Sequence, residues 1–288
     1  MEFTSCCKAL WLREDVLASP KLWGYLDLRA YQCTAPSASQ SGTSYSKLLS
    51  VAAWLSRHHR GLHECDLFWW SSWDLSGLPA SLRPLTDAMA GSALTTLRVL
   101  LPGEDVLSEE LVQLLPRLPA LSHLRMKAGQ WQQPLPFQLS ELCGLRTLYV
   151  SYFAAFGGGS WAPLLGLTAL TKLHMEGCQL KQLPGELTAL EGLAWLGIVD
   201  NEAPLDEASW ELLPRLKALT ALKLQGCSLS ALPPQLSALT QLAYLSVSGN
   251  GDVGYKADKS NSSHEAWAPL QHLTALTKLK LDSCGVGL

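Results

Sequence analysis

Charge is scarce in this 288-residue sequence, and neither sign dominates. Aspartate, glutamate, lysine and arginine together make up only 16% of the residues, and the formal net charge is -3. Proteins that bind nucleic acids usually carry a clear excess of basic residues, so we expect no nucleic-acid partner. The chain is nevertheless rich in core-forming residues, because 48% of it is hydrophobic. Such a composition excludes general disorder.

Long apolar runs are also missing. A transmembrane helix needs roughly 18 or more consecutive apolar residues, and no stretch of that length occurs. Residues 1–12 lack the apolar segment of a secretory signal. The cysteines are scattered along the chain and are not concentrated as in small disulfide-bonded secreted domains. These features predict reduced thiols, no membrane association, and a location in the cytoplasm or the nucleus.

The signature motifs of the common enzyme classes are absent as well. The sequence has no G-x-S-x-G, H-E-x-x-H or kinase motif. Gly157–Ser160 is not followed by the Gly-Lys-Ser/Thr of a phosphate-binding loop, so it is interpreted as a turn. The ligand-type residues of His58–Cys65 are interrupted by Gly61, and zinc needs three or four converging ligands. We predict no enzyme, no cofactor and no metal.

A repeat dominates the sequence instead. Leucines recur in the frame L-x-x-L-x-x-L-x-L, and a cysteine or asparagine follows at a fixed point. The clearest copies begin at Leu167, Leu216 and Leu273. The cysteines and asparagines at the fixed point are Cys178, Asn201, Cys227, Asn250 and Cys284. This is the pattern of leucine-rich repeats, in which each copy forms one strand, a turn and a return segment.

About nine copies can be aligned, and they alternate in type. The first strand leucines Leu124, Leu173 and Leu222 are 49 residues apart, which indicates a unit of two repeats. Leucines at alternate strand positions point the same way and fill the interior. The asparagine or cysteine satisfies backbone groups at the strand exit. The prediction is an α/β leucine-rich-repeat solenoid, or horseshoe, at residues 61–288, with a parallel sheet on its concave face and a helical N-terminal region at residues 1–60.

The N-terminal region carries a second pattern. Its residues 6–28 resemble the second half of an F-box, which reads C-K-x-W followed by Leu-Trp before a strand-like L-D-L. The residues that carry the resemblance are Cys7, Lys8, Trp11, Leu22 and Trp23. In the F-box/LRR family such a segment precedes the repeats, so the resemblance implies contact with a SKP1-type adaptor. The family's first half is missing from the sequence. The alternative is a helical cap over the first repeat, and residues 44–59 predict an amphipathic helix in either case.

The residues that flank the strand leucines are expected to face outward on the concave side. Aromatic and basic residues are frequent there, and these residue types often anchor protein interfaces. The predicted partner-binding residues are Phe68, Trp69, Arg125, Lys127, Tyr149, Tyr152, Lys172, His174, Trp195, Lys223, Tyr244, Lys278 and Lys280. Trp195 and Tyr244 occupy equivalent positions two strands apart, about 10 Å. The composition of this face suits an acidic or phosphorylated protein segment.

A protein–protein interaction module is therefore the predicted function. By the resemblance, it is the substrate-recognition part of an F-box/LRR-type ubiquitin-ligase receptor. The alternative is an intracellular leucine-rich-repeat scaffold or signalling protein with no ligase link. Because the last repeat is broken off at Leu288, we also expect a further segment, a partner or a second copy to cover that edge.

Overall fold

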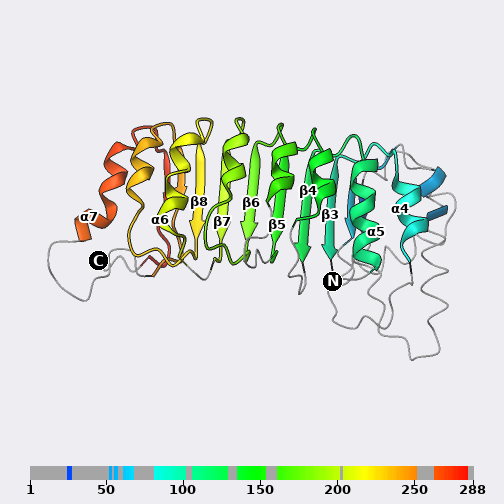
Figure 1. Ribbon diagram of the computed structural model, residues 1–288, viewed down its shortest axis with the longest axis horizontal. Helices are drawn as coiled ribbons and strands as arrows, with labels where there is room; N and C mark the ends of the chain where they lie inside the picture. Colours follow the sequence, from blue (N-terminus) through cyan, green and yellow to red (C-terminus); the bar gives the residue numbers. More distant parts are fainter. Residues whose placement is uncertain are drawn as a thin grey trace, which may run out of the picture. The chain divides into compact units, whose positions relative to one another are not determined.

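The computed structural model describes ten stretches of the chain. They are residues 25–27, 52–53, 55–57, 61–67, 81–101, 106–128, 135–153, 161–201, 204–251 and 263–284. The chain divides into two compact units, residues 1–129 and residues 130–288. Figure 1 labels several helices and strands of each unit. Of the predicted residues, Cys7, Lys8, Trp11, Leu22, Trp23, Phe68 and Trp69 lie outside the described stretches.

The first unit contains four described parallel strands that pair in sequence order. They are β1 (Tyr25–Asp27), β2 (Glu64–Leu67), β3 (Thr96–Leu101) and β4 (His123–Ala128). The return segments between them include α4 (Arg83–Met89), α5 (Val106–Leu114) and the 3-10 helix η4 (Leu115–Arg117). β1 falls within the region predicted to be helical, and its backbone pairs with β2 as one more strand of the sheet. The helix predicted over residues 44–59 is seen in part, with Ala52 and Leu55 buried.

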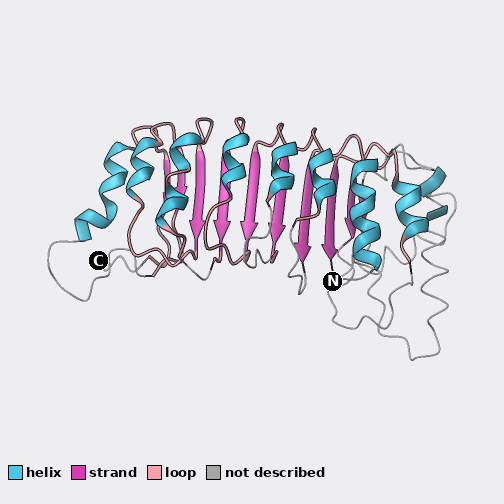
Figure 2. Ribbon diagram, in the orientation of Figure 1, coloured by secondary structure: helices cyan, strands magenta, loops and turns pink. Residues whose placement is uncertain are grey.

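The second unit contains six described parallel strands, again in sequence order. They are β5 (Thr147–Ser151), β6 (Lys172–Glu176), β7 (Trp195–Val199), β8 (Ala221–Gln225), β9 (Tyr244–Ser246) and β10 (Lys278–Lys280). The return segments are α6 (Glu207–Trp210), α7 (Ser263–Trp267) and the 3-10 helices η5 (Phe137–Glu141), η6 (Ala162–Gly166), η7 (Gly185–Ala189), η8 (Leu213–Arg215), η9 (Pro234–Ala238) and η10 (Ala268–His272). Figure 2 shows these helices over one face of the strands, and none of the described helices lies over the other face.

The leucines of the repeat build the core, as predicted. Leu173 of β6 pairs with Leu196 of β7, which pairs with Leu222 of β8, and all three are fully buried. Along each strand the side chains alternate in direction, since successive residues of a strand point to opposite faces of the sheet. Leu279 of β10 occupies the same row, yet it is 38% exposed, since no described strand lies beyond it. The residues between the leucines therefore form the open face.

The strands of the second unit end in a shared backbone turn. One to three residues after each strand, an equivalent position of every repeat in this unit has a positive φ, a conformation that non-glycine residues rarely adopt. These residues are Tyr152 (63°), Gly177 (60°), Asp200 (50°), Gly226 (59°), Gly249 (74°) and Ser283 (57°). The N–H groups of the first five continue the ladder into the next repeat, as in the 2.7 Å bond from Tyr152 to the Glu176 carbonyl. This turn sends the chain from the sheet to the return segments.

The asparagines satisfy the backbone at the strand exit, as predicted from the repeat. Asn250 is 1% exposed, and its Nδ2 donates to the carbonyls of Leu224 and Val247 at 2.6 Å each. Its Oδ1 accepts from the N–H groups of Cys227 at 2.8 Å and Leu229 at 3.1 Å. One buried side chain thus serves four backbone groups that lie away from water, where an unpaired group is costly.

The cysteines occupy the same position in the alternate repeats. The Cys227 thiol donates to the carbonyl of Ile198 at 3.3 Å, and the Cys284 thiol donates to that of Val247 at 3.0 Å. Burial raises the pKa of Cys178 and of Cys227 from 9.0 to about 12. Both are free thiols, as is Cys143, which is exposed. The buried thiols of Cys178, Cys227 and Cys284 therefore act as neutral hydrogen-bond donors within the core.

We predict that Cys178 and Cys227 resist alkylation in the folded chain, whereas Cys143 reacts. The thiolate is the nucleophile, and a pKa near 12 keeps it scarce at neutral pH. Iodoacetamide labelling, read site by site by mass spectrometry with and without denaturant, measures this. The folded state favours the neutral form of these two thiols over the thiolate. The stability that each buried neutral thiol contributes is therefore complete below about pH 9 and is lost as the pH rises toward 12. Equal labelling of the three sites in the folded chain would contradict the prediction.

Candidate functional site

The outward residues of the second unit fall into rows across its strands. One row runs Lys172, Trp195, Ala221, Tyr244 and Lys278, and the next runs Tyr149, His174, Gly197, Lys223, Ser246 and Lys280. Trp195 and Tyr244 each pair with Ala221 between them, so their predicted equivalence is confirmed. We call this surface of strands β5–β10 the strand face.

Three rings on the strand face pack against one another and form what we call the aromatic cluster. The His174 ring lies between those of Tyr149 and Trp195, with centroids 5.0 Å and 5.5 Å apart and interplanar angles of 42° and 30°. Aromatic pairs at such separations attract beyond their buried area. The aromatic cluster is therefore built from three strands, β5, β6 and β7, and no single segment of the sequence contains all of its rings.

His174 was predicted as an outward contact residue, and it does lie in the outward row, between Tyr149 and Gly197. It is only 8% exposed, because the neighbouring rings cover it. Its Nε2 lies 3.7 Å from Oε2 of Glu176 on the same strand, and Ser151 Oγ donates to that same carboxylate oxygen at 3.3 Å. His174 therefore supports the aromatic cluster from within and offers little surface to a partner.

Lys172 lies over the aromatic cluster. Its Nζ is 4.5 Å from the centroid of the Trp195 ring and 5.3 Å from that of Tyr149. A cation at this distance from a ring face is attracted by the negative π surface. A similar pair occurs two strands further on, where Lys278 Nζ lies 5.8 Å from the Tyr244 centroid. The predicted interleaving of lysines and aromatic residues is thus present in the second unit.

Gly197 leaves the space that the Trp195 ring occupies against β7. A Cβ atom at Gly197 would collide with the outer edge of the Trp195 ring and would lie 2.6 Å from Nδ1 of His174. The absence of a side chain in the middle of β7 therefore lets the indole lie against the strand beside the imidazole. A glycine inside a strand weakens it and often marks a close approach. That signal was available in the sequence, although Gly197 was not predicted as a site residue.

Tyr152 belongs to the turn and not to a strand row, which differs from the prediction. Its φ is 63°, its ring lies against Gly177, and it is 44% exposed. The negative charge of Glu176 raises the pKa of its hydroxyl, with smaller contributions from burial and from Asp200. Tyr152 consequently stays protonated as a hydrogen-bond donor over a wider pH range.

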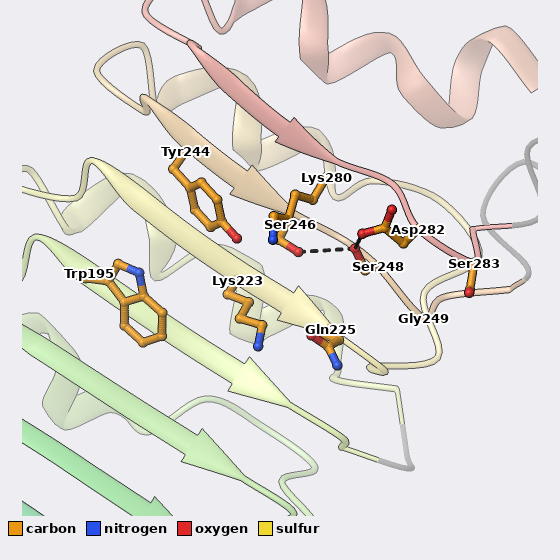
Figure 3. Close-up of a pocket in the computed structure, with 10 residues that line it drawn as sticks. All are labelled: Trp195, Lys223, Gln225, Tyr244, Ser246, Ser248, Gly249, Lys280, Asp282 and Ser283. Carbon is orange, nitrogen blue, oxygen red and sulfur yellow. Dashed lines mark hydrogen bonds between the residues drawn. The ribbon is translucent and has the colours of Figure 1, made fainter.

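A hollow of about 480 Å³ opens on the strand face beside Trp195. The side chains of Trp195, Lys223, Tyr244 and Lys280 project into it from four neighbouring strands (Figure 3). Its far end is polar, since Ser248 Oγ accepts from Ser246 at 3.4 Å and donates to Asp282 Oδ2 at 3.3 Å. Ser246, Ser248 and Asp282 were not among the predicted site residues.

Other predicted residues lie in the first unit. Arg125 and Lys127 are exposed on β4, at alternate positions as predicted. Nearby Arg98 of β3 lies 3.5 Å from a Glu64 carboxylate oxygen of β2. Within the described residues, no cluster of histidine, cysteine, aspartate or glutamate could hold a metal ion. In that part of the chain, no helix has the length and apolarity needed to cross a bilayer.

Known structures resemble this chain in fold. No protein-family model matches the sequence, and no curated protein matches it significantly. Internalin C2 of Listeria monocytogenes is similar with 17% identity and a TM-score of 0.51, over 83% of this chain and 92% of that one. A leucine-rich-repeat protein of Leptospira interrogans is similar with 17% identity and a TM-score of 0.54, over 94% of this chain and 63% of that one.

A third similar structure is TLR13 in a complex with the RNA ssRNA13. The identity is 17% and the TM-score 0.51, over 79% of this chain and 30% of the TLR13 chain. At this level of identity the likeness concerns the fold alone. Together with the parallel strands and the leucine register, it establishes that the chain has a leucine-rich-repeat fold.

Proposed function

We propose that this protein is a binding module that recognises another protein through the strand face of its second unit. The observation that carries the proposal is the aromatic cluster, in which the rings of Tyr149 and Trp195 are held in place by His174 and covered by Lys172. Tryptophan and tyrosine are the residues that most often dominate binding energy at interfaces. Rings already fixed by their neighbours lose little conformational freedom on binding.

The open face of a rigid sheet suits this role. Its leucine rows are buried and fixed by the ladder, so the outward side chains keep a constant spacing of roughly 4.8 Å between strands. Trp195 and Tyr149 are each half-buried, and the apolar surface that they leave in contact with water carries a cost. A partner that covers the remaining accessible surface of Trp195 and Tyr149 would remove that cost.

The test is affinity capture with the tagged full chain from a lysate of its source, compared between the native sequence and Trp195→Ala. We expect at least one abundant partner whose recovery falls roughly tenfold or more in the variant, as for removal of a central interface aromatic. The matched control is Phe137→Ala, since Phe137 is 70% exposed on η5, among the return segments. Thermal unfolding of each variant checks the fold.

The same capture addresses the ligase proposal. A role as an F-box/LRR-type substrate receptor rests on the resemblance of residues 6–28, and it requires a SKP1-type adaptor among the captured proteins. Its recovery should survive Trp195→Ala, because the adaptor would contact Cys7, Lys8, Trp11, Leu22 and Trp23. A capture that holds Trp195-dependent partners and no such adaptor favours a scaffold without a ligase link. Identical recoveries in the native chain and Trp195→Ala would remove the strand face from the binding site.

A further inference from the structure

The hollow beside Trp195 has two lysines that nothing else in the described chain engages. Lys223 of β8 and Lys280 of β10 lie in one row on either side of Ser246 of β9. Among the described residues, neither ammonium group has an ion pair, a hydrogen bond or a ring contact. The other two lysines of the strand face, Lys172 and Lys278, lie over aromatic rings. Two lysines, Lys223 half-buried and Lys280 exposed, therefore line the hollow, and no described acidic group is in contact with either ammonium group.

The geometry suits one anionic group held by both lysines. Their Cα atoms are two strand spacings apart, about 10 Å, a gap that two lysine side chains can close around an ion placed between them. Lys223 is half-buried, and charges interact more strongly where water is partly excluded. Trp195 and Tyr244 form the apolar walls on the other side of the hollow. Ala221, paired between those two residues, carries too small a side chain to fill the space.

The character of the hollow favours a carboxylate over a phosphate. Bidentate recognition of a phosphate comes from arginine forks, and free backbone N–H groups also hold phosphates; no described arginine lines the hollow. The N–H of Gly249, which borders it, is already bonded to the Asp282 carbonyl at 2.8 Å. The Asp282 carboxylate also lines the hollow, and it would repel a doubly charged phosphate more than a singly charged carboxylate.

We propose that the hollow formed by Trp195, Lys223, Tyr244 and Lys280 binds the carboxylate side chain of an acidic segment in the partner protein. The proposal rests on the proposed function and specifies the partner's chemistry. The carboxylate accepts charge-assisted hydrogen bonds from both ammonium groups, and the aliphatic part of the same side chain packs between the two rings. The neighbouring aromatic cluster then anchors an adjacent part of the segment.

The test begins with selection of random displayed peptides on the native full chain, with Trp195→Ala as background. We expect the selected peptides to share an aspartate or glutamate. One synthetic peptide is then measured by fluorescence anisotropy against the native chain, Lys223→Gln and Lys280→Gln, together with its Glu→Gln analogue. Each single change should weaken binding about tenfold, and the peptide change should have little further effect in the lysine variants, since the same contact is already lost.

The control variant is Lys217→Gln, an exposed lysine after η8 that alters net charge equally and should leave the dissociation constant unchanged. Peptides that need Trp195 but bind Lys223→Gln and Lys280→Gln with unchanged affinity would overturn the carboxylate site and leave the proposed function standing. A phosphoserine analogue that binds more tightly than the glutamate peptide would overturn the choice of carboxylate. A selection no richer than the Trp195→Ala background would overturn the site, and a negative lysate capture would then remove the proposed function too.

Discussion

Replacement of Asn250 by alanine is expected to lower the free energy of unfolding by about 3 to 5 kcal/mol. The side chain is 1% exposed and bonds two backbone carbonyls and two backbone N–H groups. Each buried group left without a partner costs roughly 1 to 3 kcal/mol. The total is less than the sum, because the groups are neighbours and relax together. Urea unfolding followed by circular dichroism measures the change.

Two further variants make the Asn250 result specific. Gln241→Ala removes an exposed amide from the same repeat and should change stability by less than about 0.5 kcal/mol. Asn250→Cys places in this repeat the residue that serves the same position at Cys227 and Cys284, where the thiol donates to a buried carbonyl. It should recover part of the loss, since a thiol can donate but is a weak acceptor. Equal stability of Asn250→Ala and Gln241→Ala would show that the asparagine bonds contribute nothing net.

Replacement of Gly197 by alanine is expected to weaken partner binding about tenfold or more while leaving most of the stability intact. The new methyl group would overlap the edge of the Trp195 ring and approach His174 Nδ1 to 2.6 Å. The indole is the part that can yield, because it stands on the open face and the strand is fixed by the ladder on both sides. Its displacement separates it from His174 and Lys172 and removes the pre-arranged anchor.

The comparison for Gly197→Ala is Gly185→Ala, at an exposed glycine of η7 where an added methyl group would meet no atom within 4 Å. Binding of the partner recovered by lysate capture is measured by titration calorimetry, and thermal unfolding is recorded for both variants. Loss of binding in Gly197→Ala with a melting temperature close to that of Gly185→Ala supports the role assigned to the glycine. Retained affinity would mean that the position of the Trp195 ring is irrelevant to recognition.

Much of the fold could be predicted because the repeat is local and periodic. The rows of Leu173, Leu196 and Leu222 follow from a two-residue alternation, and they lie in the predicted register. The hydrogen-bonding role of Asn250 follows from the need to satisfy a buried turn. β1 was not predicted as a strand of the repeat sheet, although the L-D-L that overlaps it is strand-like, because the rest of the repeat frame is absent there. Tyr152 was misplaced because its left-handed φ depends on the turn, and tyrosine itself does not favour it.

The sequence by itself determined which residues of the second unit face inward and which face outward, because strand geometry converts spacing into direction. It could not determine what the outward side chains do once they meet. The burial of His174 depends on rings contributed by Tyr149 and Trp195, and the hollow depends on residues from Trp195 to Ser283. Only the tertiary structure decided these features, since a side chain's position is set by neighbours that the fold, and not the sequence, places beside it.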